Sequence, residues 1–178
     1  MKTICLDNIF NIDELFWLYD NLLNTEGWKF NAIPERNTKD TNKLYGNLGM
    51  LAINYNSSWF TYFQGLIFRI NKELMDKKNT KIHYNMKRIF INATSPFSKH
   101  WLHTDSSENN EISILTMFSP QWQDSWLGSF FVDGEEYKMK PGRTIIFDSK
   151  KFHTGSNPHE NSPYIRLTCN IVVMPNKI

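Results

Sequence analysis

Polar and apolar residues alternate most clearly near the C-terminus, over residues 164–173. Such alternation predicts a β-strand, because successive side chains of a strand point to opposite faces of its sheet. The apolar face comprises Ile165, Leu167, Cys169, Ile171 and Val173. The polar face comprises Arg166, Thr168 and Asn170, and the pattern alone leaves open whether this face meets solvent or a binding site.

Two segments show the spacing of apolar residues that is typical of helices. The first is expected over residues 12–24, with Asn11 as its N-cap and Glu14 in the position of a capping box. Its expected buried residues are Ile12, Leu15, Phe16, Tyr19, Leu22 and Leu23. The second helix is expected over residues 58–77, and its apolar stripe is predicted to pack on a sheet. That stripe comprises Trp59, Phe60, Phe63, Ile67, Ile70 and Leu74.

Shorter strands and loops are predicted between and after these helices. Residues 28–33 are expected to form a strand, and the polar stretch 34–49 is expected to be a surface loop. The sequence Lys-Pro-Gly-Arg at 140–143 predicts a turn, and the apolar run at 144–147 predicts a strand after it. His153 follows this strand closely, so the strand would bring it to the rim of a sheet.

Composition indicates one globular domain. The 178 residues contain no Pro/Gly/Ser-rich linker, and a net charge of +2 without a concentrated basic stripe argues against a nucleic-acid surface. The first residues do not resemble a signal peptide, and no apolar run approaches the length of a membrane span. The two cysteines, Cys5 and Cys169, support neither a disulfide framework nor a cysteine metal site. We therefore expect a cytoplasmic protein without a membrane partner.

The triplet His103-Thr104-Asp105 and the later His153 suggest a metal site. A histidine and a carboxylate two residues apart on an extended chain point the same way, and a distant histidine can complete one face of a metal ion. Two imidazoles and one carboxylate suit non-haem Fe(II) in an oxygenase, although the same donors can also hold zinc. Arg166 adds a planar donor that suits a buried carboxylate, so an anionic ligand beside the metal is expected.

The order of these motifs resembles the Fe(II)- and 2-oxoglutarate-dependent dioxygenases of the prolyl 4-hydroxylase-like group. The resemblance covers residues 80–175 and rests on the segments 88–92, 103–105, 119–122, 126–128, 141–143, 147–148, 153 and 166–168. It implies a mainly β fold with flanking helices, whose core is a double-stranded β-helix, also called a jelly roll and similar to the cupins. Residues 1–178 would form a single domain, with residues 1–79 mostly as helical support.

The resemblance also implies roles for particular residues. His103, Asp105 and His153 would be the metal ligands and the catalytic centre. Arg166 would bind the distal carboxylate of 2-oxoglutarate, Thr168 would add a hydroxyl to it, and Asn92 would make a further polar contact. The implied cofactors are Fe(II), 2-oxoglutarate as co-substrate, O2, and ascorbate as an accessory reductant.

Several positions separate this chain from parts of that group. Relatives often carry two glycines and an acid after the tryptophan, where this chain has Leu-Gly-Ser-Phe at 127–130. Collagen-type prolyl hydroxylases commonly have lysine in place of Arg166. Related halogenases replace the carboxylate ligand by a small residue, so Asp105 favours hydroxylation. His83, His100 and His159 are not assigned as ligands, and His153 is preferred to His159 because it follows the preceding strand more closely.

The expected reaction is hydroxylation of a peptidyl residue, with proline as the first candidate, coupled to conversion of 2-oxoglutarate to succinate. A free amino acid or another small metabolite is the alternative substrate, and nucleic-acid dealkylation ranks third because the residues after Arg166 do not reproduce the dealkylase pattern. The alternative that is not an enzyme is a non-catalytic, cupin-like binding module. Substrate selection is expected to depend on the loops 34–56 and 106–111.

Overall fold

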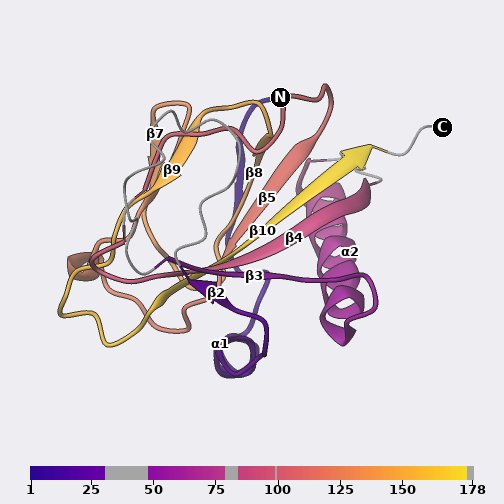
Figure 1. The fold of residues 1–178 in the computed structure, drawn as a ribbon. Coiled ribbons are helices and arrows are strands. Elements are labelled where there is room, and N and C mark those ends of the chain that lie inside the picture. The colour runs from indigo at the N-terminus through magenta and orange to yellow at the C-terminus, as the bar shows by residue number, and fades with distance from the viewer. Residues whose placement is uncertain (31–47, 79–83, 99, 176–178) are drawn as a thin grey trace.

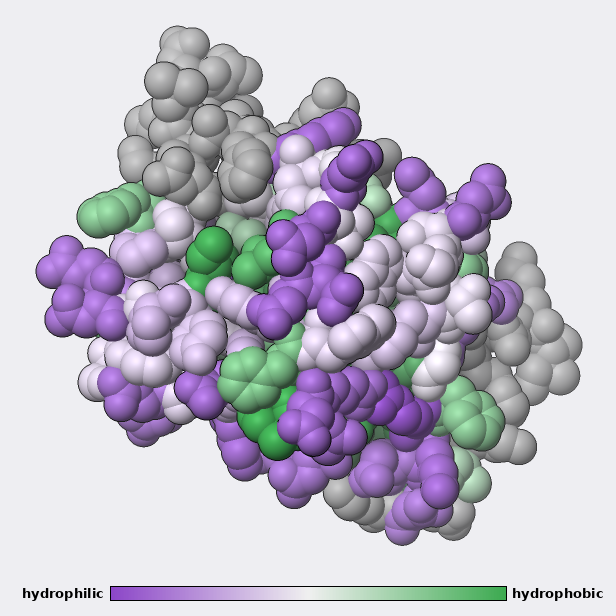
Figure 2. Space-filling model, turned by 90° about the horizontal axis from the view of Figure 1, so that it is seen from below, coloured by the Kyte–Doolittle hydropathy of each residue, from purple (hydrophilic) through white to green (hydrophobic). Residues whose placement is uncertain are grey.

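The computed structural model describes residues 1–30, 48–78, 84–98 and 100–175. Figure 1 shows two β-sheets beside each other, with two helices on the outer side of the larger sheet. Seen from below, hydrophobic residues lie in small groups among hydrophilic ones (Figure 2). Among the helices within these ranges, none is both long enough and apolar enough to cross a membrane.

The larger sheet has seven strands, and every neighbouring pair in it is antiparallel. Its order across the sheet is β1 (Ile4–Leu6), β8 (Thr144–Asp148), β5 (Ile112–Met117), β10 (Arg166–Pro175), β4 (Tyr84–Thr94), β3 (Leu48–Ala52) and β2 (Lys29–Phe30). The long strands β4 and β10 lie next to each other, and Arg166 pairs with Thr94 at one end of their ladder.

The smaller sheet has three short strands in the order β7 (Glu135–Tyr137), β6 (Phe130–Val132) and β9 (His153–Gly155). A 3-10 turn, η1 (Asp124–Trp126), precedes it in the chain. A buried cluster joins strands of both sheets and comprises Leu115, Met117, Phe130, Val132, Met139, Ile145 and Phe147. Two antiparallel sheets with a shared core are the jelly-roll architecture that the family resemblance implied.

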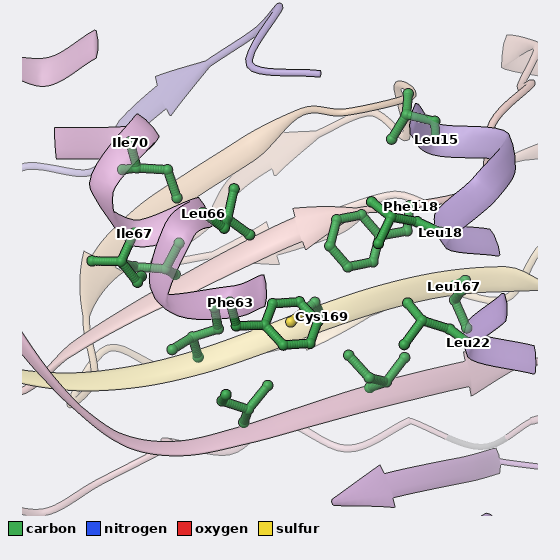
Figure 3. Packing of buried hydrophobic residues seen from close by; sticks show 14 of the residues in the cluster. Leu15, Leu18, Leu22, Phe63, Leu66, Ile67, Ile70, Phe118, Leu167 and Cys169 are labelled. Atoms are coloured by element: carbon green, nitrogen blue, oxygen red, sulfur yellow. The ribbon is translucent and has the colours of Figure 1, made fainter. Parts of the chain in front are cut away.

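The helices α1 (Ile12–Leu23) and α2 (Ser58–Lys78) cover the outer face of the larger sheet. In Figure 3 their apolar side chains meet Leu167 and Cys169 of β10 and Phe118, which follows β5. Leu167, Cys169, Ile171 and Val173 are fully buried on this face, as the alternating pattern predicted. Ile165 is 42% exposed, because it precedes the first residue of β10.

The N-terminus of α1 differs in part from the predicted capping box. Asn11 Oδ1 accepts a hydrogen bond from the Glu14 backbone N–H at 2.8 Å, so the N-cap is confirmed. The Glu14 carboxylate does not return to Asn11 but accepts hydrogen bonds from Arg69 and Tyr62 of α2. Glu14 therefore ties the two helices together.

Other predictions about the N-terminal part need correction. Ile12 is 50% exposed instead of buried, whereas Leu18, which the expected stripe left out, is fully buried. The predicted loops 34–49 and 34–56 both overlap β3, which begins at Leu48, so neither segment is all loop. The predicted strand 28–33 contains β2, and residues 31–33 and 34–47 lie outside the described residues. Besides the helices, the first 79 residues contribute β1, β2 and β3 to the larger sheet.

Candidate metal centre

The ends of three chain segments bring His103, Asp105 and His153 together. His103 and His153 form an antiparallel bridge, with the His103 N–H 3.1 Å from the His153 carbonyl and the His153 N–H 2.9 Å from the His103 carbonyl. The Asp105 N–H donates to the Ser149 carbonyl at 3.0 Å in the turn after β8. One ligand atom from each of the three side chains lies within 4.8 Å of the others, so the three can hold one metal ion.

Both imidazole rings are oriented by a backbone carbonyl two residues earlier. His103 Nδ1 lies 3.1 Å from the Trp101 carbonyl, and His153 Nδ1 lies 3.0 Å from the Lys151 carbonyl. Since a carbonyl can only accept, each Nδ1 carries a hydrogen, and in the neutral ring Nε2 is then the nitrogen with the lone pair. This tautomer is the one in which Nε2 binds a metal.

The Asp105 carboxylate is held by three neighbours. The Asn170 amide donates to both of its oxygens at 2.9 Å, and Ser113 Oγ donates to Oδ2 at 2.5 Å. Arg88 Nη2 lies 3.3 Å from Oδ1. Burial raises the pKa of Asp105, but the protonated form of His153, where it occurs, and the hydrogen bonds from Ser113 and Asn170 outweigh burial, so its pKa is lowered. The carboxylate is thus kept ionised, which is the form that binds a metal.

His153 is kept in its neutral form. Its side chain is 2% exposed, and burial lowers its pKa although the nearby Asp105 acts in the opposite direction. His153 Nε2 lies 3.5 Å from Asp105 Oδ2. A neutral imidazole beside an ionised carboxylate is the protonation state that metal binding requires.

Arg166 is a buried cation on the face of β10 that points between the sheets. It is 3% exposed, and its Nε donates to the Gly128 carbonyl at 2.6 Å. Its Nη2 is buried and has no hydrogen-bond partner among the described residues. Burial lowers the pKa of the guanidinium to about 10, so Arg166 is still charged at neutral pH. A buried charge without a counter-ion is costly, and an anionic ligand would supply one.

The other predicted co-substrate residues lie on the same face. Thr168 is two residues after Arg166 in β10 and pairs with Asn92 of β4. Thr168 is 2% exposed and Asn92 is half-buried. Asn170, two residues further on, contacts Asp105, so one strand face runs from the buried arginine to the His-Asp-His group.

The remaining histidines lie in different places. His159 is not part of the group, because its Nδ1 accepts a hydrogen bond from the Asn161 N–H at 3.1 Å and its backbone bonds to Trp126. His83 lies outside the described residues. His100, which was not assigned as a ligand, is half-buried beside Arg166, and burial together with the Arg166 charge lowers its pKa to about 4.

Three supporting residues, Arg88, Ser113 and Asn170, were not predicted to act at the site. The alternation in residues 164–173 placed Asn170 on the face of Arg166, and this was the signal that could have identified it. Ser113 and Arg88 meet Asp105 only through the pairing of β5 and β4 with β10. The pattern of residues within one segment does not show which strands will pair.

Comparison with solved structures shows the same architecture over nearly the whole chain. A prolyl hydroxylase from Trichoplax adhaerens, solved with a hypoxia inducible factor peptide fragment, matches with a TM-score of 0.65 at 15% identity, over 97% of this chain and 83% of that one. A member of the 2OG-Fe(II) oxygenase family from Burkholderia pseudomallei matches with a TM-score of 0.66 at 16% identity, over 98% and 86%. This chain has their fold.

A third solved structure with this fold belongs to an epimerase and not to a hydroxylase. It is SnoN, a non-heme alpha ketoglutarate dependent epimerase from nogalamycin biosynthesis, with a TM-score of 0.69 at 10% identity over 97% of this chain and 78% of that one. No family model and no curated protein matches the sequence. Identities this low establish a common fold, whereas the reaction must be argued from the site itself.

Proposed function

We propose that this protein is an Fe(II)- and 2-oxoglutarate-dependent dioxygenase that hydroxylates a peptidyl residue, with proline as the first candidate. One observation carries the proposal: β10, whose Asn170 contacts Asp105 of the His-Asp-His group, also carries Arg166, a buried cation whose Nη2 has no hydrogen-bond partner among the described residues. A three-ligand group leaves metal positions open for further ligands, and the arginine suits a carboxylate. A co-substrate with a metal-binding end and a distal carboxylate satisfies both features.

The donor set fits iron. Two imidazoles with free Nε2 lone pairs and one ionised carboxylate are the ligands of non-haem Fe(II) oxygenases. Iron bound with 2-oxoglutarate and O2 supplies an oxidant for unactivated C–H bonds, and 2-oxoglutarate is converted to succinate. Ascorbate would serve as an accessory reductant.

The residues of this chain would bind, orient and shield the reactants. Asn170 and Ser113 fix the Asp105 carboxylate, and the two backbone carbonyls fix the imidazole rings. Arg166 would hold the far end of the co-substrate, with Thr168 and Asn92 beside it on the same face. Fixing both ends of the co-substrate orients its reactive end at the metal and limits turnover in unproductive geometries.

The peptide substrate is tested by incubating the protein with Fe(II), 2-oxoglutarate, ascorbate and proline-containing peptides. Mass spectrometry should show that one peptide gains the mass of one oxygen atom on proline. The Asp105→Ala variant should give no product, because it removes the carboxylate ligand. If a free amino acid gains oxygen and no peptide does, the proposed substrate class is wrong.

A small-molecule substrate is the second candidate, because the SnoN epimerase has this fold at a TM-score of 0.69. The same incubation with a panel of free amino acids separates the two candidates. A cupin-like binding module would give neither product nor succinate with any substrate in the panel.

A further inference from the structure

Buried polar atoms without partners gather beside Arg166. They include Arg166 Nη2, Thr94 Oγ1 and His100 Nε2, for which the described residues supply no hydrogen-bond partner. Thr94 is 1% exposed and pairs directly with Arg166 across the β4–β10 ladder. Since buried polar atoms in folded proteins are nearly always hydrogen-bonded, a group of orphans in one place marks a position where a ligand supplies the partners.

Gly155 shows how close His100 and Arg166 are. A Cβ atom on Gly155 would lie 3.2 Å from Arg166 Nη1, 3.3 Å from Arg166 Nη2 and 3.3 Å from His100 Cε1. The guanidinium and the imidazole therefore border the same small space, and the missing side chain of Gly155 keeps that space open. Gly155 ends β9, the strand that begins with His153, so the space lies next to the metal group.

We propose that His100 is a second binding residue for the carboxylate that pairs with Arg166, and that it donates a hydrogen bond from Nε2 to that carboxylate. The inference rests on the proposed function, in which this carboxylate is the distal one of 2-oxoglutarate. His100 and Arg166 would then both donate hydrogen bonds to one carboxylate. His100 lies three residues before His103 in the chain.

The charge of the pocket agrees with this role. Burial, and after it the neighbouring Arg166 charge, lower the pKa of His100 to about 4, although the Asn157 side chain acts in the opposite direction. At neutral pH the ring is uncharged and carries one N–H, so the pocket holds one cation for one carboxylate. A second buried cation would need a second anion.

Anaerobic titration of the Fe(II)-loaded protein with 2-oxoglutarate tests the proposal. Chelation of iron by a 2-oxo acid gives a visible charge-transfer absorption, which reports binding without turnover. The His100→Leu variant removes the donor and should raise the Kd for 2-oxoglutarate roughly tenfold to a hundredfold, as expected for a lost hydrogen bond to a charged group. The His100→Gln variant should recover part of the affinity, because its amide can donate.

Two controls make the test specific. The His159→Leu variant carries the same substitution outside the pocket and should bind 2-oxoglutarate as the wild type does. The second control uses 2-oxobutanoate, which keeps the chelating end and lacks the distal carboxylate. His100→Leu should leave its Kd nearly unchanged, because the contact that the variant removes is absent from this ligand.

A Gly155→Ala variant tests the same pocket without altering His100. Its Cβ would crowd both the guanidinium and the imidazole, so it should also weaken 2-oxoglutarate binding more than 2-oxobutanoate binding. This variant keeps the proposal testable if His100→Leu does not fold.

The outcomes separate the inference from the proposed function. If the wild type forms the complex and His100→Leu binds 2-oxoglutarate equally well, the role of His100 is wrong while the dioxygenase proposal stands. An equal loss for both 2-oxo acids also overturns it, because the effect then does not depend on the distal carboxylate. If the wild type forms no complex with iron and 2-oxoglutarate, both proposals fail.

Discussion

Asn170 contacts both carboxylate oxygens of the candidate metal ligand Asp105. Its amide donates to both carboxylate oxygens at 2.9 Å. It also limits rotation of the carboxylate. Residues that orient a metal ligand in this way commonly affect metal affinity nearly as much as the ligand does.

Replacement of Asn170 by leucine should therefore weaken Fe(II) binding by roughly 10- to 100-fold, as is typical when a hydrogen-bond partner of a ligand is lost. Competition with a chromophoric chelator under anaerobic conditions measures this affinity. Asn85→Leu is the matched control, because Asn85 lies at an exposed position of β4. Equal Fe(II) affinities of the two variants would show that Asn170 does not position Asp105.

At the scale of residues, the sequence predicted well which residues share one face of a strand. It predicted less well which residues from different segments lie close together. Alternation put Arg166, Thr168 and Asn170 on one side of a strand, and β10 confirms this. His100 could not be assigned to the pocket, because it lies in an irregular segment and reaches Arg166 only through the placement of Gly155 on another strand.

At the scale of elements, α2 depends on one buried face. Phe63 is fully buried against Phe118, whereas Phe68 on the same helix is 73% exposed. Phe63→Ala should lower the free energy of unfolding by about 3–5 kcal/mol, and Phe68→Ala should change it by no more than about 0.5 kcal/mol. Denaturant titration measures both, and similar losses in the two variants would contradict this packing.

Asp7, directly after the short strand β1, links this strand to the turn before β8. The Asp7 carboxylate accepts hydrogen bonds from Arg143 at 2.9 and 3.1 Å and from Lys140 at 2.8 Å. The Arg143 hydrogen bond, helped by Lys140, lowers the pKa of Asp7 to about 2. A lowered pKa in the folded state means that the stabilisation is complete above the unfolded pKa of about 4 and is lost as the pH falls through about 2.

The Asp7→Asn variant should thus be less stable than the wild type at neutral pH, by about 1 kcal/mol after allowance for solvent screening. The difference should shrink below pH of about 4 and vanish as the pH falls below about 2, where the wild-type carboxyl also becomes protonated. Unfolding free energies measured across this range check the prediction. A difference that does not change with pH would contradict the assigned role of Asp7.

Elements with strong periodicity were predicted well, and short ones were not. The helix expected at 58–77 is α2, and its stripe packs on the larger sheet as predicted. The three-residue strands β6, β7 and β9 are too short to show a period, and β3 begins directly after a polar stretch. Their conformation is determined by pairing with neighbouring strands, which a single sequence does not reveal.

At the scale of the whole molecule, the jelly roll places the candidate site between the two sheets. β9 of the smaller sheet carries His153, and β10 of the larger sheet carries Arg166, Thr168 and Asn170. The helices stabilise the opposite face of the larger sheet and make no contribution to the His-Asp-His group. The fold could be predicted because several motifs appear in a known order. The substrate could not, because a common fold does not determine what its site binds.

The most direct test of the central claim is the release of succinate from 2-oxoglutarate by the purified protein. We expect succinate only when Fe(II) and O2 are present, and none from the Asp105→Ala variant, which lacks the carboxylate ligand. The Asp20→Ala variant, altered at an exposed position of α1, should release as much as the wild type. Succinate release that is equal in Asp105→Ala and the wild type, or its absence with every substrate offered, would contradict the account.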